Sequence, residues 1–176
     1  ALVSAFLWAA TGLNCPSYFA SAEGCNRFYL FWLMTLGALM GVFLAADLFT
    51  LFVFFEMMSF TSYVWVAQNE TEEAVRAGQT YLAVAVIGGM ALLTGLVLLQ
   101  HLLGTLDFAE LAAAVSTLPE EKRTALYTAG GLALAGFGAK AGMFPLHIWL
   151  PKAHPVAPAP ASARLSGILT KSGVVG

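Results

Sequence analysis

Residues 47–66 read DLFTLFVFFEMMSFTSYVWV, in which Asp47 is followed by an apolar run with one carboxylate, Glu56, near its middle. A helix of about 20 apolar residues crosses the hydrocarbon core of a bilayer, so this stretch predicts a transmembrane helix. Asp47 precedes the run and is expected to cap its N-terminus. Glu56 lies nine residues further on. At about 1.5 Å per residue this is about 13 Å along the helix, which places a titratable group near the middle of the membrane.

The composition of the whole chain agrees with this interpretation. The chain is 59% hydrophobic and 10% charged, and its mean hydropathy is +0.79. Soluble domains are about 45–50% apolar and about 25% charged, so too few polar side chains are present here to cover a water-facing surface. We expect an integral, multi-pass, all-α membrane protein. The net charge of −2 is spread over short loops without a basic run, which excludes nucleic acid as a partner.

The apolar stretches predict a transmembrane helix bundle that forms part of a single membrane domain. The expected spans are 1–13 (partial), 28–46, 48–67, 77–103, 124–142 (broken after its end) and 159–176 (truncated). Residues 14–26 are expected to form a polar loop. Within the more polar segment 104–123, DFAELAAAV predicts a short amphipathic helix at the membrane interface. The chain starts without Met and stops inside an apolar run, so we expect it to be an internal fragment of a longer polytopic protein.

Residues 136–155, GFGAKAGMFPLHIWLPKAHP, place Lys140 in an Ala/Gly-rich helix shortly before a proline. Pro145 lacks a backbone N–H and disfavours helical geometry at the preceding residue, so we expect a discontinuous helix with its break at Lys140–Pro145. Broken helices at membrane depth are tolerated where they are buried in protein or line a wet cavity. A charge beside such a break is typical of ion sites in transporters.

Three ionisable residues are expected inside the spans, namely Glu56, Lys140 and Lys171. Each costs about 2.5–3.5 kcal/mol at the centre of a membrane helix, and such residues usually mark ion or proton pathways. The alternatives are a buried ion pair that only fixes helix packing and a lysine that extends to the surface. His147 follows the break and either relays protons near neutral pH or caps a helix.

Other chemistries have little support in the sequence. Three scattered histidines match no tight metal motif, so we expect no metal and no cofactor in this chain. No nucleophile–base motif supports an intramembrane hydrolase, and whether the chain is part of an enzyme stays open. Cys15 and Cys25 either pair as a disulfide, if their loop faces an oxidising compartment, or remain thiols.

Two stretches carry a family resemblance, residues 47–66 and GAKAGMFPLHIWLPKAHPVAPAPASARLSGILTKSGVVG at 138–176. From about Phe28 to Gly176 the chain resembles the antiporter-like proton-translocating subunits. These subunits occur in respiratory complex I, energy-converting hydrogenases and multisubunit cation/proton antiporters. The resemblance implies that the chain covers about helices four to eight of a subunit with roughly fourteen helices, whose second symmetry-related half lies outside it.

The same resemblance implies roles for single residues. Glu56 matches the glutamate of the fifth helix, Lys140 the lysine of the discontinuous seventh helix, and Lys171 the lysine or histidine of the eighth. In the implied mechanism, Glu56 modulates Lys140, which takes up a proton and passes it to Lys171. Arg164 departs from the pattern, which has an apolar or small residue at that place.

The resemblance also implies partners and a setting. We expect a proton-translocating subunit of a redox-driven complex of the NADH:quinone oxidoreductase or hydrogenase type, in a prokaryotic cell membrane. Its partners would be other membrane subunits, the lipid bilayer and H⁺, with Na⁺ left open as the transported ion. A subunit of a multisubunit Na⁺/H⁺ antiporter is the first alternative. A structural membrane bundle without transport is an alternative of another class.

Overall fold

The computed structural model describes residues 1–18 and 25–175, which form helices and contain no strand. The prediction of an all-α fold is confirmed. The α-helices are α1 (Leu2–Tyr18), α2 (Cys25–Leu44), α3 (Leu48–Val66), α4 (Glu72–Leu103), α5 (Phe108–Ser116), α6 (Arg123–Ala141), α7 (Leu150–Val156), α8 (Ala159–Arg164) and α9 (Thr170–Val175). Short 3₁₀ turns are η1 (Glu120–Lys122) and η2 (Leu146–Trp149), and η3 (Leu165–Leu169) is a π-helical turn.

The first helix is longer than expected. α1 continues to Tyr18, so the prediction of a loop that begins at residue 14 was wrong. Once a helix has nucleated, propagating it by one more turn costs little, and the polar residues after Leu13 do not stop it. Whether Cys15 and Cys25 pair stays open, because the side chain of Cys15 lies outside the part of the chain that the structure describes.

Helices α2, α3 and α4 are long and apolar enough to cross a membrane. On α4, Ile87 and Met90 are each 66% exposed, so an apolar face points outward where lipid would cover it. α6 is rich in Ala and Gly and falls outside this set, so its crossing stays a prediction. The organisation of all the expected spans as one membrane domain likewise stays a prediction.

Local signals set where α3 and α4 begin. The Asp47 carboxylate accepts from the Thr50 backbone N at 2.8 Å and from the Thr50 hydroxyl at 2.6 Å. These bonds, the hydroxyl bond foremost, hold the pKa of Asp47 below its usual value. α4 begins before the expected Ala77, because Thr71 caps it by accepting from the Ala74 backbone N at 3.2 Å. Acidic side chains then occupy its first turn, where their negative charge interacts favourably with the positive end of the helix dipole.

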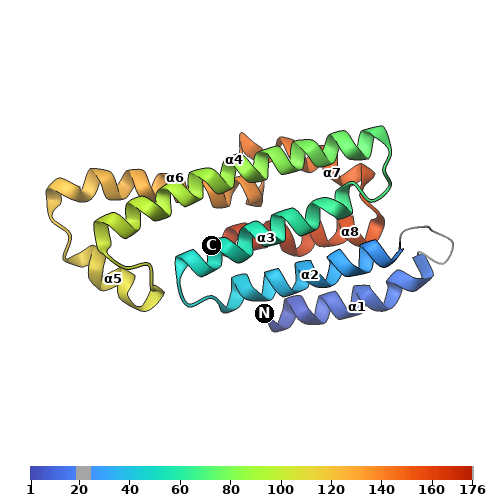
Figure 1. The fold of residues 1–176 in the computed structure, drawn as a ribbon, viewed down its shortest axis with the longest axis horizontal. Coiled ribbons are helices and arrows are strands. Elements are labelled where there is room, and N and C mark those ends of the chain that lie inside the picture. The colour runs from blue at the N-terminus through green and yellow to red at the C-terminus, as the bar shows by residue number, and fades with distance from the viewer. Residues whose placement is uncertain (19–24, 176) are drawn as a thin grey trace.

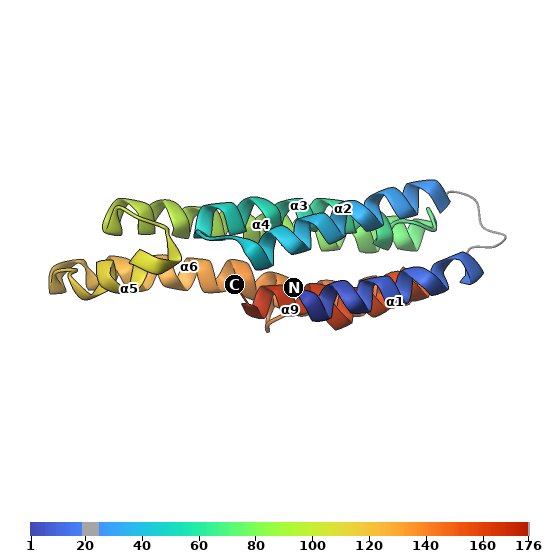
Figure 2. The same cartoon turned by 90° about the horizontal axis from the view of Figure 1, so that it is seen from below.

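The helices lie in two layers. Figure 2 shows α2, α3 and α4 in one layer, and α1, α6 and α9 in the other. Within the first layer α3 packs between α2 and α4, and α4 makes its most extensive contact with α6 across the layers. Figure 1 shows α6 running beside the C-terminal part of α4, on the left of the view. The Lys140 helix is thereby covered by α4.

Glycines bring α4 and α6 to backbone contact. A Cβ on Gly95 would lie 2.7 Å from the carbonyl oxygen of Ala129, and a Cβ on Gly136 would lie 2.6 Å from that of Gly88. Small residues at such points let membrane helices approach closely. The close approach therefore depends on the absence of a side chain at these positions.

Replacing Gly136 with Ala should lower the free energy of unfolding by about 1–3 kcal/mol, because the added methyl group overpacks against rigid backbone. Gly131→Ala in the same helix is the matched control, since a Cβ there meets nothing within 4 Å. The control should be neutral or slightly stabilising, because Ala favours helix over Gly. Thermal unfolding of the purified protein in detergent checks both. Equal melting temperatures for the two variants would contradict the packing interpretation.

At one end of the bundle, hydrogen bonds join the connection between α2 and α3 to the connection between α4 and α5. Asp47 and Asp107 form an isolated antiparallel bridge, with Leu48 N donating to Leu106 O at 3.0 Å and Phe108 N to Ala46 O at 3.2 Å. Asp107 also caps α5 by accepting from Ala109 N at 2.8 Å. α5 coincides with the expected amphipathic helix, and Figure 1 shows it at the end of the bundle beyond α4.

Candidate functional site

Lys140 lies inside the bundle. It is in the last turn of α6 and only 3% exposed. Its Nζ donates to the Ser59 hydroxyl of α3 at 2.9 Å and to the Tyr81 hydroxyl of α4. The amine therefore does not extend to the surface, and two helices of the other layer supply its ligands.

The ligands of Lys140 belong to a hydroxyl cluster, made up of Ser59, Ser62 and Tyr81. All three side chains are at most 1% exposed. The Tyr81 and Ser62 hydroxyl oxygens are 2.6 Å apart. Ser59 donates to the Phe55 carbonyl oxygen at 3.0 Å, and Ser62 to that of Met58 at 2.6 Å. Each hydroxyl of this cluster therefore has a hydrogen-bond partner inside the bundle.

Glu56 lies one helical turn before Ser59, half-buried. Its Oε1 is buried and finds no hydrogen-bond donor among the described residues. No ion pair within 4.0 Å joins it to Lys140 in that part of the chain. The carboxylate instead packs against Gly89 of α4, where an added Cβ would lie 2.4 Å from Oε1. The acid and the amine are therefore neighbours but not in contact.

The helix break falls inside the expected interval, but Gly142 rather than Pro145 ends the helix. Gly142 adopts a left-handed conformation with φ 75°, which glycine tolerates best, and Met143 N donates to Gly138 O at 2.8 Å. Pro145 comes later and precedes η2. The Trp149 indole then donates to the Ala139 carbonyl at 2.9 Å, which satisfies a carbonyl of the last helical turn and fixes the turn that carries Lys140.

Lys171 does not join this cluster. It is exposed on α9. The helices themselves meet at this level, since a Cβ on Gly173 would lie 2.6 Å from the Phe137 carbonyl oxygen of α6. A cavity of about 520 Å³ is lined by Gly138 of α6 and Val174 of α9, and neither lysine lines it. The structure thus brings the two helices together and leaves the two amines on different faces.

The other candidates stand apart from the buried amine. His147 is exposed and its ring stacks on Phe144, with 5.6 Å between the centroids. Arg164 is buried where α8 meets α1, with its guanidinium carbon 6.0 Å from the centroid of the Trp8 ring. Trp8 also packs against Trp32 and Trp65.

The sequence reasoning missed Ser59, Ser62, Tyr81 and the role of Trp149. Glu56, Ser59 and Ser62 are spaced three residues apart, so they share one face of α3. This polar stripe could have been recognised from the sequence. A buried tyrosine needs a hydrogen-bond partner, but nothing local shows which partner it will find.

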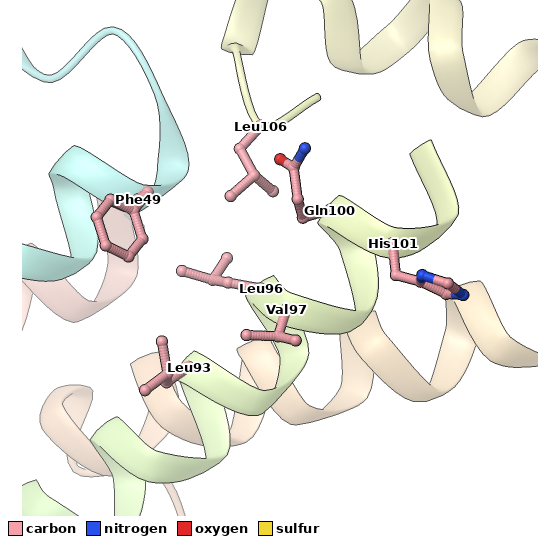
Figure 3. Close-up of a pocket in the computed structure, with 7 residues that line it drawn as sticks. All are labelled: Phe49, Leu93, Leu96, Val97, Gln100, His101 and Leu106. Carbon is pink, nitrogen blue, oxygen red and sulfur yellow. The ribbon is translucent and has the colours of Figure 1, made fainter. Parts of the chain in front are cut away.

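An apolar pocket of about 430 Å³ lies elsewhere, between the start of α3 and the end of α4. Figure 3 shows Phe49 and Leu106 facing Leu93 and Leu96, with Gln100 and His101 further along α4. None of the residues that line it carries a carboxylate or an amine. Within residues 1–18 and 25–175 no group of three or more His, Cys, Asp or Glu is placed to hold a metal ion.

Comparison with known proteins places this arrangement in a family. Residues 45–176 match the family described as NADH:quinone oxidoreductase/Mrp antiporter, transmembrane. Hydrogenase-4 component B of Escherichia coli (strain K12) is 34% identical over 99% of this chain and 26% of its own length. A Na⁺/H⁺ antiporter subunit of Alkalihalophilus pseudofirmus is 35% identical over 84% of this chain and 29% of its own length. The chain thus spans between a quarter and a third of these relatives.

Solved structures agree with this placement. The membrane-bound sulfane sulfur reductase, an archaeal respiratory membrane complex, matches with a TM-score of 0.85 at 28% identity, over 96% of this chain and 35% of the other. The Mrp complex from Dietzia sp. matches with a TM-score of 0.80 at 28% identity, over 96% and 32%. The chain is an integral membrane protein and belongs to the antiporter-like membrane subunit family of NADH:quinone oxidoreductase and the Mrp antiporters.

Proposed function

We propose that the chain is the part of a proton-translocating subunit in which Lys140 carries the proton and Glu56 controls its release. The observation that supports this most directly is an amine, 3% exposed, held inside the helix bundle by neutral hydroxyls rather than by a carboxylate. Hydroxyl ligands offset only part of the cost of a buried charge, so the charged form depends on its surroundings.

The hydrogen bonds of Lys140 and Glu56 support a pair of side chains that can come together and separate. An ammonium has three N–H donors, and the Lys140 amine uses two of them on Ser59 and Tyr81. Oε1 of Glu56 is a buried acceptor without a donor in the described part of the chain. A movement that brings the two side chains together would let them satisfy each other. Approach of the carboxylate favours the charged amine, and its withdrawal favours release of the proton.

Lys171 is the proposed recipient. The backbones of α6 and α9 are in contact near both lysines, and the 520 Å³ cavity lies between the two helices. The onward path would run through parts of the subunit that this chain does not contain, and through other membrane subunits.

We further propose that a redox-driven complex owns the subunit. The alignment with hydrogenase-4 component B covers 99% of the chain at 34% identity, whereas those with antiporter relatives cover 84% at 35% identity or 98% at 30% identity. The antiporter remains the second candidate, because its identity of 35% and the TM-score of 0.80 to the Mrp complex are of the same order. Proton movement in sealed vesicles that hold the whole complex separates them, since one needs an electron donor and the other a Na⁺ or K⁺ gradient.

Lys171→Met should lower the rate of proton movement by the whole complex roughly fivefold, about 1 kcal/mol in the barrier, because it removes the acceptor of the transferred proton. Lys152→Met on α7 is the matched control, since this lysine is also exposed but lies outside the proposed path. A pH-sensitive dye inside the vesicles gives the rate. If both variants transport like the wild type, Lys171 has no part in the path.

A further inference from the structure

The hydroxyl cluster around Lys140 has a fixed direction of donation. Ser59 and Ser62 are in α3, and each gives its single hydrogen to a carbonyl oxygen one turn back, Phe55 at 3.0 Å and Met58 at 2.6 Å. The Ser62 and Tyr81 hydroxyl oxygens are 2.6 Å apart, and either could donate. With the Ser62 hydrogen on the Met58 carbonyl oxygen, only Tyr81 has a hydrogen left for this contact. All three hydroxyl hydrogens therefore point away from Lys140.

The cluster consequently offers Lys140 only acceptor lone pairs. An ammonium, which has donors and no lone pair, fits such a set. A neutral amine has a lone pair that needs a donor, and one hydroxyl would have to turn to supply it. Each such turn gives up a buried hydrogen bond, to Phe55, to Met58 or between Tyr81 and Ser62.

We infer that the Ser59–Ser62–Tyr81 cluster selects the ammonium form of Lys140, and that Tyr81 is the positioning residue that sets the pH range in which Lys140 gives up its proton. This rests on the proposed function. Tyr81 is the most suitable of the three to turn, since its reversal leaves both serine–carbonyl bonds in place. Its ring is held independently against Trp149, with 4.9 Å between the centroids.

Few other titratable groups lie around the amine. From α3 the nearest is Glu56, and from α4 it is Tyr81 itself. η2 and α9, which also pack on α6, carry His147 and Lys171 at exposed positions. The charged residues of η1 lie at the opposite end of α6. A change at Tyr81 should thus be felt through Lys140 and modulated by Glu56.

Tyr81→Phe removes one acceptor and keeps the ring in place. We expect the alkaline limb of the pH profile of proton movement to shift to lower pH by roughly one unit, because one charge-assisted hydrogen bond to the ammonium is lost. Adding Ser59→Ala should extend the shift in the same direction. Tyr127→Phe is the matched control, because this tyrosine of α6 is 70% exposed and should leave the profile unchanged.

The assay uses the complete complex in sealed vesicles, with assembly checked on native gels. A purely structural role for Tyr81 would lower the rate equally at every pH, and that result would overturn the inference. So would an unchanged profile in Tyr81→Phe when Lys140→Met is inactive, and the proposed function would then stand alone. Transport by Lys140→Met would overturn both.

Discussion

Lys140→Met is expected to reduce proton movement by the assembled complex to less than about one hundredth of the wild-type rate, a barrier increase of roughly 3 kcal/mol. Methionine is unbranched like lysine, although one atom shorter, and it cannot carry a proton. The buried site, in which Lys140 is 3% exposed, accepts an apolar side chain readily. Ser59 and Ser62 keep their bonds to backbone carbonyls, so the fold should survive the change.

Lys140→Arg distinguishes a carried proton from a fixed charge. Arginine stays protonated in proteins, so it preserves the charge and cannot release a proton. We expect this variant to be inactive as well. Lys122→Met, at the exposed far end of α6, is the control and should transport normally. Full activity of Lys140→Met in an assembled complex would remove the basis of the proposed function and leave a structural bundle as the better interpretation.

Glu56→Gln should lower the rate about tenfold, roughly 1.4 kcal/mol in the barrier, because the amide keeps the shape of the carboxylate and loses the charge that tunes Lys140. The matched control is Glu72→Gln, since Glu72 is exposed at the start of α4 and pairs with Arg76 one turn later. Vesicle assays at several pH values check both variants. A normal rate in Glu56→Gln would exclude control by this carboxylate.

Gly89→Ala tests the same control without removing a charge. The added methyl group would lie 2.4 Å from Oε1 of Glu56, and the carboxylate, at the end of a flexible side chain, must move aside. The rate should change while the stability does not. Gly37→Ala, where a Cβ meets nothing within 4 Å, should change neither.

The sequence predicted the fold well where one physical signal dominates. The length of α3 is read directly from its apolar run, the Asp47 cap sets its start, and the apolar run of α4 predicts where that helix ends. It predicted boundaries less well where a weak signal competes with helix propagation, as at the end of α1. At the break, proline was the more conspicuous residue, yet the left-handed glycine at 142 comes first along the chain and ends the helix.

Within the site, the sequence predicted that Glu56 and Lys140 lie deep in the membrane, from counting residues along each helix, and this stays a prediction. The orientation of the two side chains could not be predicted. Whether each side chain faces a neighbouring helix depends on packing between segments far apart in sequence, such as Ser59 and Tyr81 against Lys140. For the same reason the sequence did not reveal that Lys171 faces outward on α9.

The π-helical turn at Leu165–Leu169 has a consequence for that lysine. In this turn the Thr170 N–H bonds to the Leu165 carbonyl, so the winding holds one residue more than an α-helix would. Each residue of an α-helix advances about 100° around the axis. If the extra residue came after Lys171 instead of before it, the Lys171 side chain would be rotated about the helix axis by about a quarter of a turn, while the helix stays intact. The direction in which Lys171 points therefore depends on the helical register that the turn at Leu165–Leu169 sets.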